Sequence, residues 1–168
     1  PNSGSNFLLE YAIFLLLEWA CYVIMIKPGY HEIMLISKFI EEHRSRTALE
    51  HEVKDLLKKL GLDLPKGVFL SKESRLSDFS SQISLLSYPL VVKISSSRIA
   101  SKSDSKGIRL GIKNSGELGE AFKELVNIRD TEGILIEEMA KGGTEVIVGG
   151  TIDKQFGPIV MFGLGGVL

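Results

Sequence analysis

Short apolar segments bounded by glycine or proline fill the second half of this chain and constrain its fold most. YPLVVKI at 88–94, ILIEEM at 134–139 and GPIVMFGLGG at 157–166 are the clearest of them. Apolar runs of this length between turn residues are typical of buried strands. Apolar residues at helical spacing in 49–60 and 115–126 predict two helices. We therefore expect an α+β fold, with strands at 67–70, 90–94, 107–112, 134–136, 145–148 and 159–162.

Local signals place the ends of both helices. Thr47 is followed three residues later by Glu50, which is the spacing of a capping box at a helix start. Gly61 has the position of a C-terminal stop, because glycine adopts the left-handed conformation without steric cost. Ser115 can cap the second helix through its hydroxyl.

The N-terminal part of the chain is of a different kind. Residues 7–26 form an apolar run of membrane-spanning length, interrupted by Glu10 and Glu18. The gain from inserting its large apolar residues, about 5 kcal/mol, is offset by a similar cost for the two acids, so hydropathy does not decide. Upstream translation or a linker, a buried or interface helix, and a membrane anchor all remain open. We expect no membrane association, and a boundary that leaves 1–33 outside the domain formed by 34–168.

Composition excludes several classes of function. The net charge of −1 gives no general attraction to nucleic acid or to an anionic membrane. One cysteine, Cys21, permits no intramolecular disulfide, which suits a cytoplasmic protein. The three histidines have no metal-ligand spacing with that cysteine, so we expect no structural zinc site.

Lys93 is the first residue with possible chemistry. In the strand at 90–94, Leu90, Val92 and Ile94 alternate onto one face and Lys93 takes the other. An ammonium in the middle of such a strand requires an anion or water. Two interpretations stay open: a contact to an anionic ligand, or a lysine that protects an edge strand from aggregation.

The segment from Lys93 to Lys113 is locally basic. It carries six lysines and arginines against one acid, Asp104, which gives a charge of +5 in a chain of −1. Its serine-rich centre also offers hydroxyl and amide groups, so such a loop can wrap phosphates. The alternative is a solvated loop without a ligand. The glycine and lysine spacing of a Walker A loop does not occur in the sequence.

The strand at 134–138 ends in Glu137 and Glu138 and runs into a glycine-bearing connector. Backbone groups at such a strand end can read an adenine edge between apolar flanks, and Glu145 can accept hydrogen bonds from a ribose. The alternative is that these acids only solvate a strand end. The GLGG sequence at 163–166 is a turn and carries no site by itself.

Together these segments resemble the ATP-grasp part of ADP-forming acyl-CoA synthetases (acetate–CoA ligases), relatives of the succinyl-CoA synthetase beta subunit. The resemblance runs from about residue 36 to 168 and rests on LEHEVKDLLKKLGLDLPKG, YPLVVKI, the KSDxxG loop at 102–107, EEMAKGGTEVIVG and QFGPIVMFGLGG. It implies an ATP-grasp fold whose second subdomain is incomplete, with ATP or ADP held between two α+β subdomains.

The resemblance also implies roles for individual residues. Lys93 would contact an ATP phosphate, and Lys102 with Gly107 would belong to the loop that covers the phosphates. The adenine-binding hinge would comprise Glu137, Glu138, Met139 and Ala140, and Glu145 would hold the ribose.

The implied activity is the reaction acyl-CoA + ADP + phosphate ⇌ acid + CoA + ATP, carried out with a CoA-binding alpha subunit or fused alpha domain. Ser101 stands where the family places the histidine that relays the phosphoryl group, and a serine without an activating base is a poor nucleophile. The Mg²⁺ ligands are expected beyond residue 168. A nucleotide-binding regulatory module, or a non-catalytic fragment without the relay, therefore stays open as the alternative.

Overall fold

The computed structural model describes residues 29–99, 106–140 and 142–165, with Ile152 and Pro158 described by their backbone alone. The chain divides into two compact units, of which one is formed by residues 48–141 and the other by the segments on either side of it. Each unit has its own sheet, four-stranded in the first and two-stranded in the second. We call them the sheet unit and the hairpin unit.

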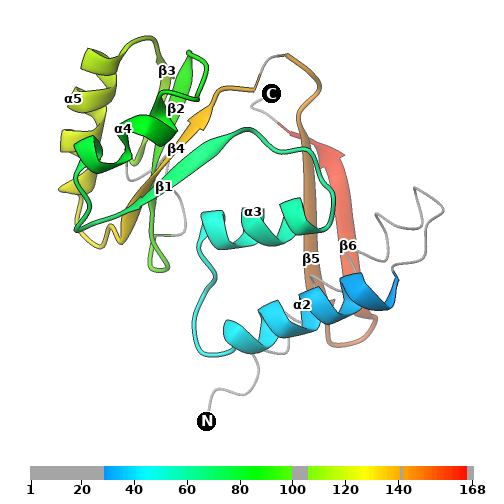
Figure 1. Ribbon diagram of the computed structural model, residues 1–168. Coiled ribbons are helices and arrows are strands. Elements are labelled where there is room, and N and C mark those ends of the chain that lie inside the picture. Colours follow the sequence, from blue (N-terminus) through cyan, green and yellow to red (C-terminus); the bar gives the residue numbers. More distant parts are fainter. Residues whose placement is uncertain (1–28, 100–105, 141, 166–168) are drawn as a thin grey trace. The chain divides into compact units, whose positions relative to one another are not determined.

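The sheet unit is built on an antiparallel sheet with strand order β1-β4-β2-β3 (Figure 1). Of the three pairs of neighbouring strands, one, β2 with β3, is consecutive in the sequence. The elements in chain order are α3 (Glu50–Lys59), β1 (Gly67–Ser71), the 3-10 helix η1 (Leu76–Phe79), α4 (Ser80–Ile83), β2 (Leu90–Ser95), β3 (Ile108–Ile112), α5 (Ser115–Val126) and β4 (Gly133–Glu138).

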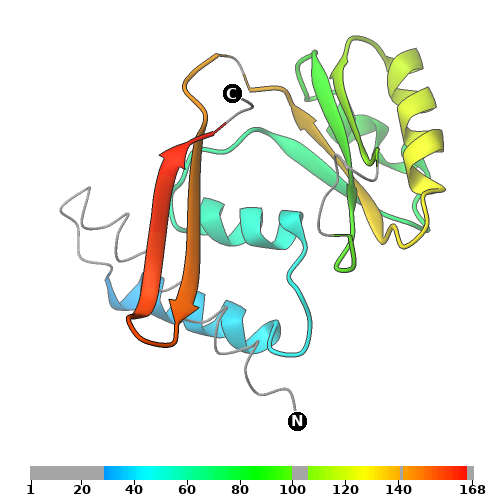
Figure 2. The ribbon, with the colours of Figure 1, turned by 180° about the vertical axis from the view of Figure 1, so that it is seen from behind.

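The core of this unit lies between the sheet and α5, which Figure 2 shows along one side of the strands. Alternate side chains of β2 and β4 point toward α5, and the four central ones are 0% exposed: Val92, Ile94, Ile134 and Ile136. From α5, Leu118 and Leu125 complete the layer at 2% and 0% exposed. Side chains at every second position of the strands thus pack with side chains at every three to four positions of the helix in one apolar layer. The expected α+β architecture is confirmed.

The start of α3 differs from the expectation. The helix begins at Glu50, and Leu49 rather than Thr47 occupies the N-cap position. The Glu52 carboxylate accepts a hydrogen bond from the Leu49 amide at 2.7 Å, which supplies the carboxylate half of a capping box. Leu49 is 8% exposed, so burial of this side chain and not a capping hydroxyl fixes the helix start. Gly61, with φ of 84°, is the predicted left-handed stop.

The start of α5 is also shifted by one residue. Asn114, not Ser115, is the N-cap, and its side-chain oxygen accepts a hydrogen bond from the Glu117 amide at 2.9 Å. Asparagine and serine are comparable as N-caps, so the sequence alone does not choose between them. The geometry does, because the backbone of Asn114 is extended while Ser115 is already helical.

The hairpin unit contains α2 (Tyr30–Glu42) and the antiparallel pair β5 (Val146–Asp153) and β6 (Gly157–Leu164). Helix α2 begins at Tyr30, so the boundary expected after residue 33 falls inside its first turn. Both strands extend farther than the sequence predicts. No helix in the described part of the chain is long and apolar enough to cross a membrane. The apolar run at 7–26 lies outside the described residues.

Candidate functional site

Lys93 occupies an interior strand, which decides between the two interpretations of its position in the sequence. Strand β2 pairs with β4 on one side and with β3 on the other. An edge strand is therefore wrong as the explanation for this lysine. Lys93 lies on the face opposite α5, and 19% of its side chain is exposed. An ammonium at this depth requires anionic partners.

Those partners form a closed ring of four charges. Two come from α3, Glu50 and Lys54, and two from the sheet, Lys93 and Glu137. The Lys93 Nζ lies 2.7 Å from a Glu50 oxygen and 2.8 Å from a Glu137 oxygen. Lys54 Nζ lies 3.0 Å from Glu50 and also donates to Glu137. Each lysine thus contacts both carboxylates, and we call this set the ionic ring.

The ring is more strongly buried on the sheet side than on the helix side. The Glu137 side chain is 4% exposed, while those of Glu50 and Lys54 are 26% and 23% exposed. Burial by itself lowers the pKa of Lys93, but hydrogen bonds to Glu137 and then Glu50 outweigh it and raise the pKa above 10.5. Lys93 is therefore held as an ammonium throughout the physiological pH range.

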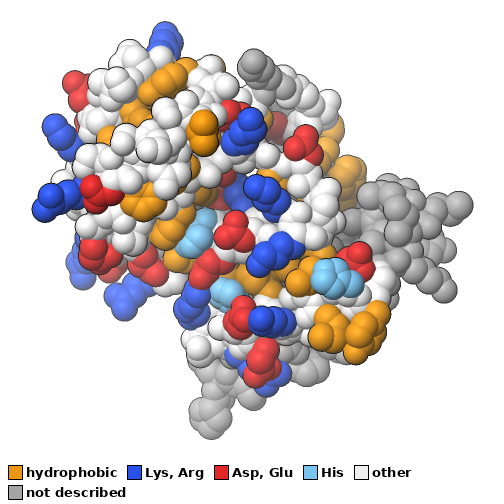
Figure 3. Space-filling view, viewed as in Figure 1, with side chains coloured by type: hydrophobic (Ala, Val, Ile, Leu, Met, Phe, Trp, Pro, Cys, Tyr) orange, Lys and Arg blue, Asp and Glu red, His pale blue; other side chains and the backbone are white. Residues whose placement is uncertain are grey.

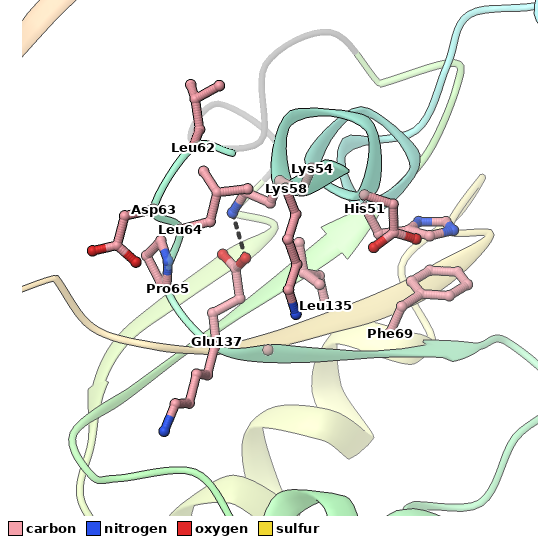
Figure 4. Close-up of a pocket in the computed structure, with 13 residues that line it drawn as sticks. His51, Lys54, Lys58, Leu62, Asp63, Leu64, Pro65, Phe69, Leu135 and Glu137 are labelled. Atoms are coloured by element: carbon pink, nitrogen blue, oxygen red, sulfur yellow. Dashed lines mark hydrogen bonds and ion pairs between the residues drawn. The ribbon is translucent and has the colours of Figure 1, made fainter. Parts of the chain in front are cut away.

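A cavity of about 400 Å³ opens beside the ring, between α3, the turn that follows it, and strands β1 and β4. Its walls combine apolar side chains, among them Pro65 and Leu135, with the charged ends of Lys54, Lys58 and Glu137 (Figure 4). The close-up shows Lys54 and Glu137 turned toward one another inside it. A flat apolar ligand with polar edges would fit against such a cavity wall.

One end of this cavity is formed by an aromatic pair. The rings of His51 and Phe69 stack with centroids 3.6 Å apart and planes 10° from parallel. His51 comes from α3 and Phe69 from β1, so the pair joins the helix to the sheet. This contact holds α3 against β1, the neighbour of the strand β4 that carries Glu137.

The predicted adenine hinge lies at the end of β4, in the same unit as Lys93. Glu137 turns inward into the ring, while Glu138 accepts a hydrogen bond from the Ser87 amide at 2.8 Å. The Met139 amide donates to the Pro89 carbonyl at 2.9 Å, which ties the hinge to the start of β2. Met139 is 37% exposed and Ala140 is exposed, so this edge is accessible.

The basic segment is described only at its two ends, since Ser101 and Lys102 lie outside the described residues. Gly107 is buried, and its carbonyl accepts a hydrogen bond from the Ile94 amide at 2.8 Å. Acids neutralise part of the positive charge: Arg98 lies 3.5 Å from Asp130, and Arg109 lies 2.8 Å from Glu124. Cationic and acidic side chains are accordingly interspersed over the face drawn in Figure 3. The segment's formal charge of +5 overstates the positive field around it.

Glu145, the predicted ribose ligand, belongs to the hairpin unit and is exposed. Its carbonyl accepts a hydrogen bond from the Gly165 amide at 2.8 Å, so the strand pairing continues beyond β6. The structure thus brings Lys93 and the residues at 137–140 together in the sheet unit. Glu145 belongs to the other unit.

The described residues contain no group of three or more His, Cys, Asp or Glu side chains arranged to hold a metal ion. Glu50 and Glu137 are saturated by two lysines, which makes the ring a poor cation site. The ring is therefore a site for paired side-chain charges and not for a bound cation.

Glu50 and Lys54 are the site residues that sequence reasoning missed. The capping-box spacing predicts a role for Glu50 at the helix start alone. The signal that could have found them is their i,i+4 spacing, which places a carboxylate and an ammonium on one face of α3. That spacing does not say which strand the face meets.

Comparison with known proteins identifies the family of this chain. Residues 39–168 match the ATP-grasp domain family. The chain is 42% identical over 130 residues to the beta subunit of ADP-forming acetate–CoA ligase I of Pyrococcus furiosus, covering 73% of this chain and 55% of that subunit. It is 36% identical over 135 residues to the ADP-forming 4-hydroxybutyrate–CoA ligase of Nitrosopumilus maritimus, covering 76% of this chain and 19% of that enzyme.

A solved structure supports the same relationship. It is an acetyl-coenzyme A synthetase of Ca. Korarchaeum cryptofilum in complex with coenzyme A and Mg-AMPPCP, with a TM-score of 0.56 and 33% identity, covering 81% of this chain and 58% of that one. The present chain thus spans little more than half of the beta subunit and of this structure. With its antiparallel sheet, its family match and these relatives, the chain belongs to the ATP-grasp domain family.

Proposed function

We propose that this chain is the nucleotide-binding part of an ADP-forming acid–CoA ligase that works in the cytoplasm. The reaction would be acyl-CoA + ADP + phosphate ⇌ acid + CoA + ATP, with a CoA-binding alpha subunit or fused alpha domain as partner. The observation that carries this proposal is the position of Lys93. It lies on the non-core face of the ATP-grasp sheet, opposite Leu135 of β4, and its ammonium contacts Glu137 near the end of that strand.

Different residues of the chain would bind different parts of the nucleotide. Lys93 would bind a phosphate oxygen through its ammonium, because a charge-assisted hydrogen bond is the strongest contact available to a phosphate. Lys102 and Gly107 would belong to the loop over the phosphates. Glu138, Met139 and Ala140 would line the adenine edge beside the cavity, and Glu145 would accept from the ribose hydroxyls. Glu137 would act behind them by holding Lys93.

These residues would bind and orient a nucleotide. Transfer of a phosphoryl group requires neutralisation of the phosphate charge, which Mg²⁺ supplies in enzymes of this chemistry. Ser101 would stand in the place of the family's relay histidine. A regulatory module that binds nucleotide without the relay is therefore the second candidate. Turnover with an alpha partner would distinguish the ligase from that module.

ATP binding tests the proposal directly. Isothermal calorimetry on the full chain compares wild type with Lys93→Met, and with Lys113→Met as the control at an exposed lysine of the same segment. Loss of one charge-assisted hydrogen bond, roughly 1.5–3 kcal/mol, predicts an affinity about 10- to 150-fold lower for Lys93→Met. The control is expected to match wild type. Equal affinities for Lys93→Met and wild type would remove Lys93 from the site.

A further inference from the structure

The ionic ring contains more charge than a phosphate-binding lysine requires. Lys93 alone, paired with Glu50 and Glu137, would give a local charge of −1 and would repel an incoming phosphate. Lys54 contacts the same two carboxylates and returns the sum to zero. The ring therefore holds an ammonium between two acids without leaving a negative field at the site.

The donor count of Lys93 leaves room for a ligand. An ammonium has three N–H donors, and two of them point to Glu50 and Glu137 at 2.7 and 2.8 Å. The third is available for an oxygen that approaches over the exposed part of the side chain. Two fixed contacts from different elements, one on α3 and one on β4, restrict the direction of that third bond.

Among the described residues, the ion pairs of Lys93 are those with Glu50 and Glu137. The charged groups that face it are Glu50 and Lys54 from α3 and Glu137 from β4. Its partner across β3 is Ile108, and the neighbouring Arg109 turns to Glu124 on α5. The protonation of this ammonium is thus governed by the ring and by burial.

We propose that Glu50 is a positioning residue that keeps the Lys93 ammonium charged and directed for a nucleotide phosphate, and that Lys54 offsets the charge of the two carboxylates so that the anion is not repelled. The desolvation cost of buried ion pairs cancels most of their Coulombic gain, so such a ring contributes little net stability. What it does supply is an ammonium fixed before the ligand arrives. The last step of this inference, binding of a nucleotide phosphate by Lys93, rests on the proposed function.

The first test observes Lys93 without nucleotide. The ammonium signal of Lys93 is followed by nitrogen-15 NMR of the full chain as pH rises, and is assigned by its loss in Lys93→Arg. In Glu50→Gln the titration midpoint is expected at lower pH than in wild type, because burial is then opposed by one carboxylate instead of two. Glu50→Asp, which retains a carboxylate, is expected to restore most of the midpoint. Glu120→Gln, the same change on the exposed side of α5, is expected to leave it unchanged.

Lys54→Gln gives a second signature that a folding defect would not produce. With Lys54 gone, Lys93 has two carboxylates to itself, so its midpoint is expected to rise. The local charge becomes −1, so ATP affinity at neutral pH is expected to fall by about tenfold. A midpoint and an affinity that move in these opposite directions would support the ring. Unchanged midpoints in both Glu50→Gln and Lys54→Gln would overturn it.

The last test joins the ring to the nucleotide. ATP affinity of Glu50→Gln is expected to decline at lower pH than that of wild type, with a difference of about tenfold near the wild-type midpoint. In a Lys93→Met background the same substitution is expected to have no effect. A difference that persists in that background would refute positioning through Lys93. Should the wild-type chain bind no ATP, the proposed function fails, while the NMR result still decides whether Glu50 and Lys54 govern Lys93.

Discussion

The two faces of the four-stranded sheet are made by the same strands and have opposite chemistry. On one face Val92 and Ile136 are 0% exposed against α5, and on the other Lys93 and Glu137, one residue farther along, form ion pairs with α3. The apolar face needs only volume and exclusion of water. The charged face needs named partners at hydrogen-bond distance, because an unpaired buried charge costs several kcal/mol. The first face therefore depends on apolar volume, and the second face depends on particular charged partners.

The largest expected effect lies on the apolar face. Leu125 of α5 is 0% exposed, and Leu125→Ala is expected to lower the free energy of unfolding by about 2–5 kcal/mol through lost burial and a residual cavity. Leu110→Ala on β3, where the side chain is 61% exposed, is expected to change it by less than about 0.5 kcal/mol. Urea denaturation of the two variants measures the contrast. Similar losses in both would mean that α5 does not close the core.

A smaller effect is expected on the charged face. Glu137→Gln leaves two lysines with one carboxylate, and is expected to cost about 2 kcal/mol of unfolding free energy. Glu138→Gln changes the neighbouring, partly exposed carboxylate and is expected to cost about 0.5 kcal/mol or less. The same denaturation experiment compares them. If the two variants lose equal stability, the ring is not the structural centre of that face.

The pH dependence of stability distinguishes the two faces again, since only the charged one titrates. The pKa of Lys93 is raised in the folded chain, because hydrogen bonds to Glu137 and Glu50 outweigh the opposing effect of burial. The stability that Lys93 contributes is complete below its pKa in the unfolded chain, about 10.5. It is lost as pH rises through the higher pKa of the folded chain. The unfolding free energy of wild type relative to Lys93→Met is thus expected to fall at strongly alkaline pH. A constant difference between the two would contradict the raised pKa.

The smallest effect concerns an acid with no buried partner. Asp153 ends β5, and the amides of Phe156 and Gln155 donate to it at 2.9 and 2.7 Å, which lowers the pKa of its carboxyl below 3.8. Stability from this turn is present above the unfolded value and lost as pH falls through the lower folded one. Carbon-13 NMR of the carboxyl is expected to show this low midpoint. Asp153→Asn keeps an acceptor and is expected to remove the acid dependence with little change at neutral pH.

The sequence by itself determined much of the fold. Apolar alternation in 90–94 and 134–136 predicted which residues of β2 and β4 would be buried, because a strand exposes alternate side chains to one environment. Helical spacing in 115–126 predicted the face of α5 that packs on them. Gly61 predicted the end of α3. These features follow from local geometry, so a single sequence contains them.

Tertiary structure alone decided the charged face. Whether Lys93 lies on an edge or in the interior depends on the strand order, and β4 pairs with β2 although 37 residues lie between Ser95 and Gly133. The choice of Glu50 and Lys54 as partners depends on how α3 lies on the sheet, since a charged helix face is compatible with solvent as well. An ion pair forms only when two side chains meet at about 3 Å, and no local pattern specifies a meeting across 43 residues.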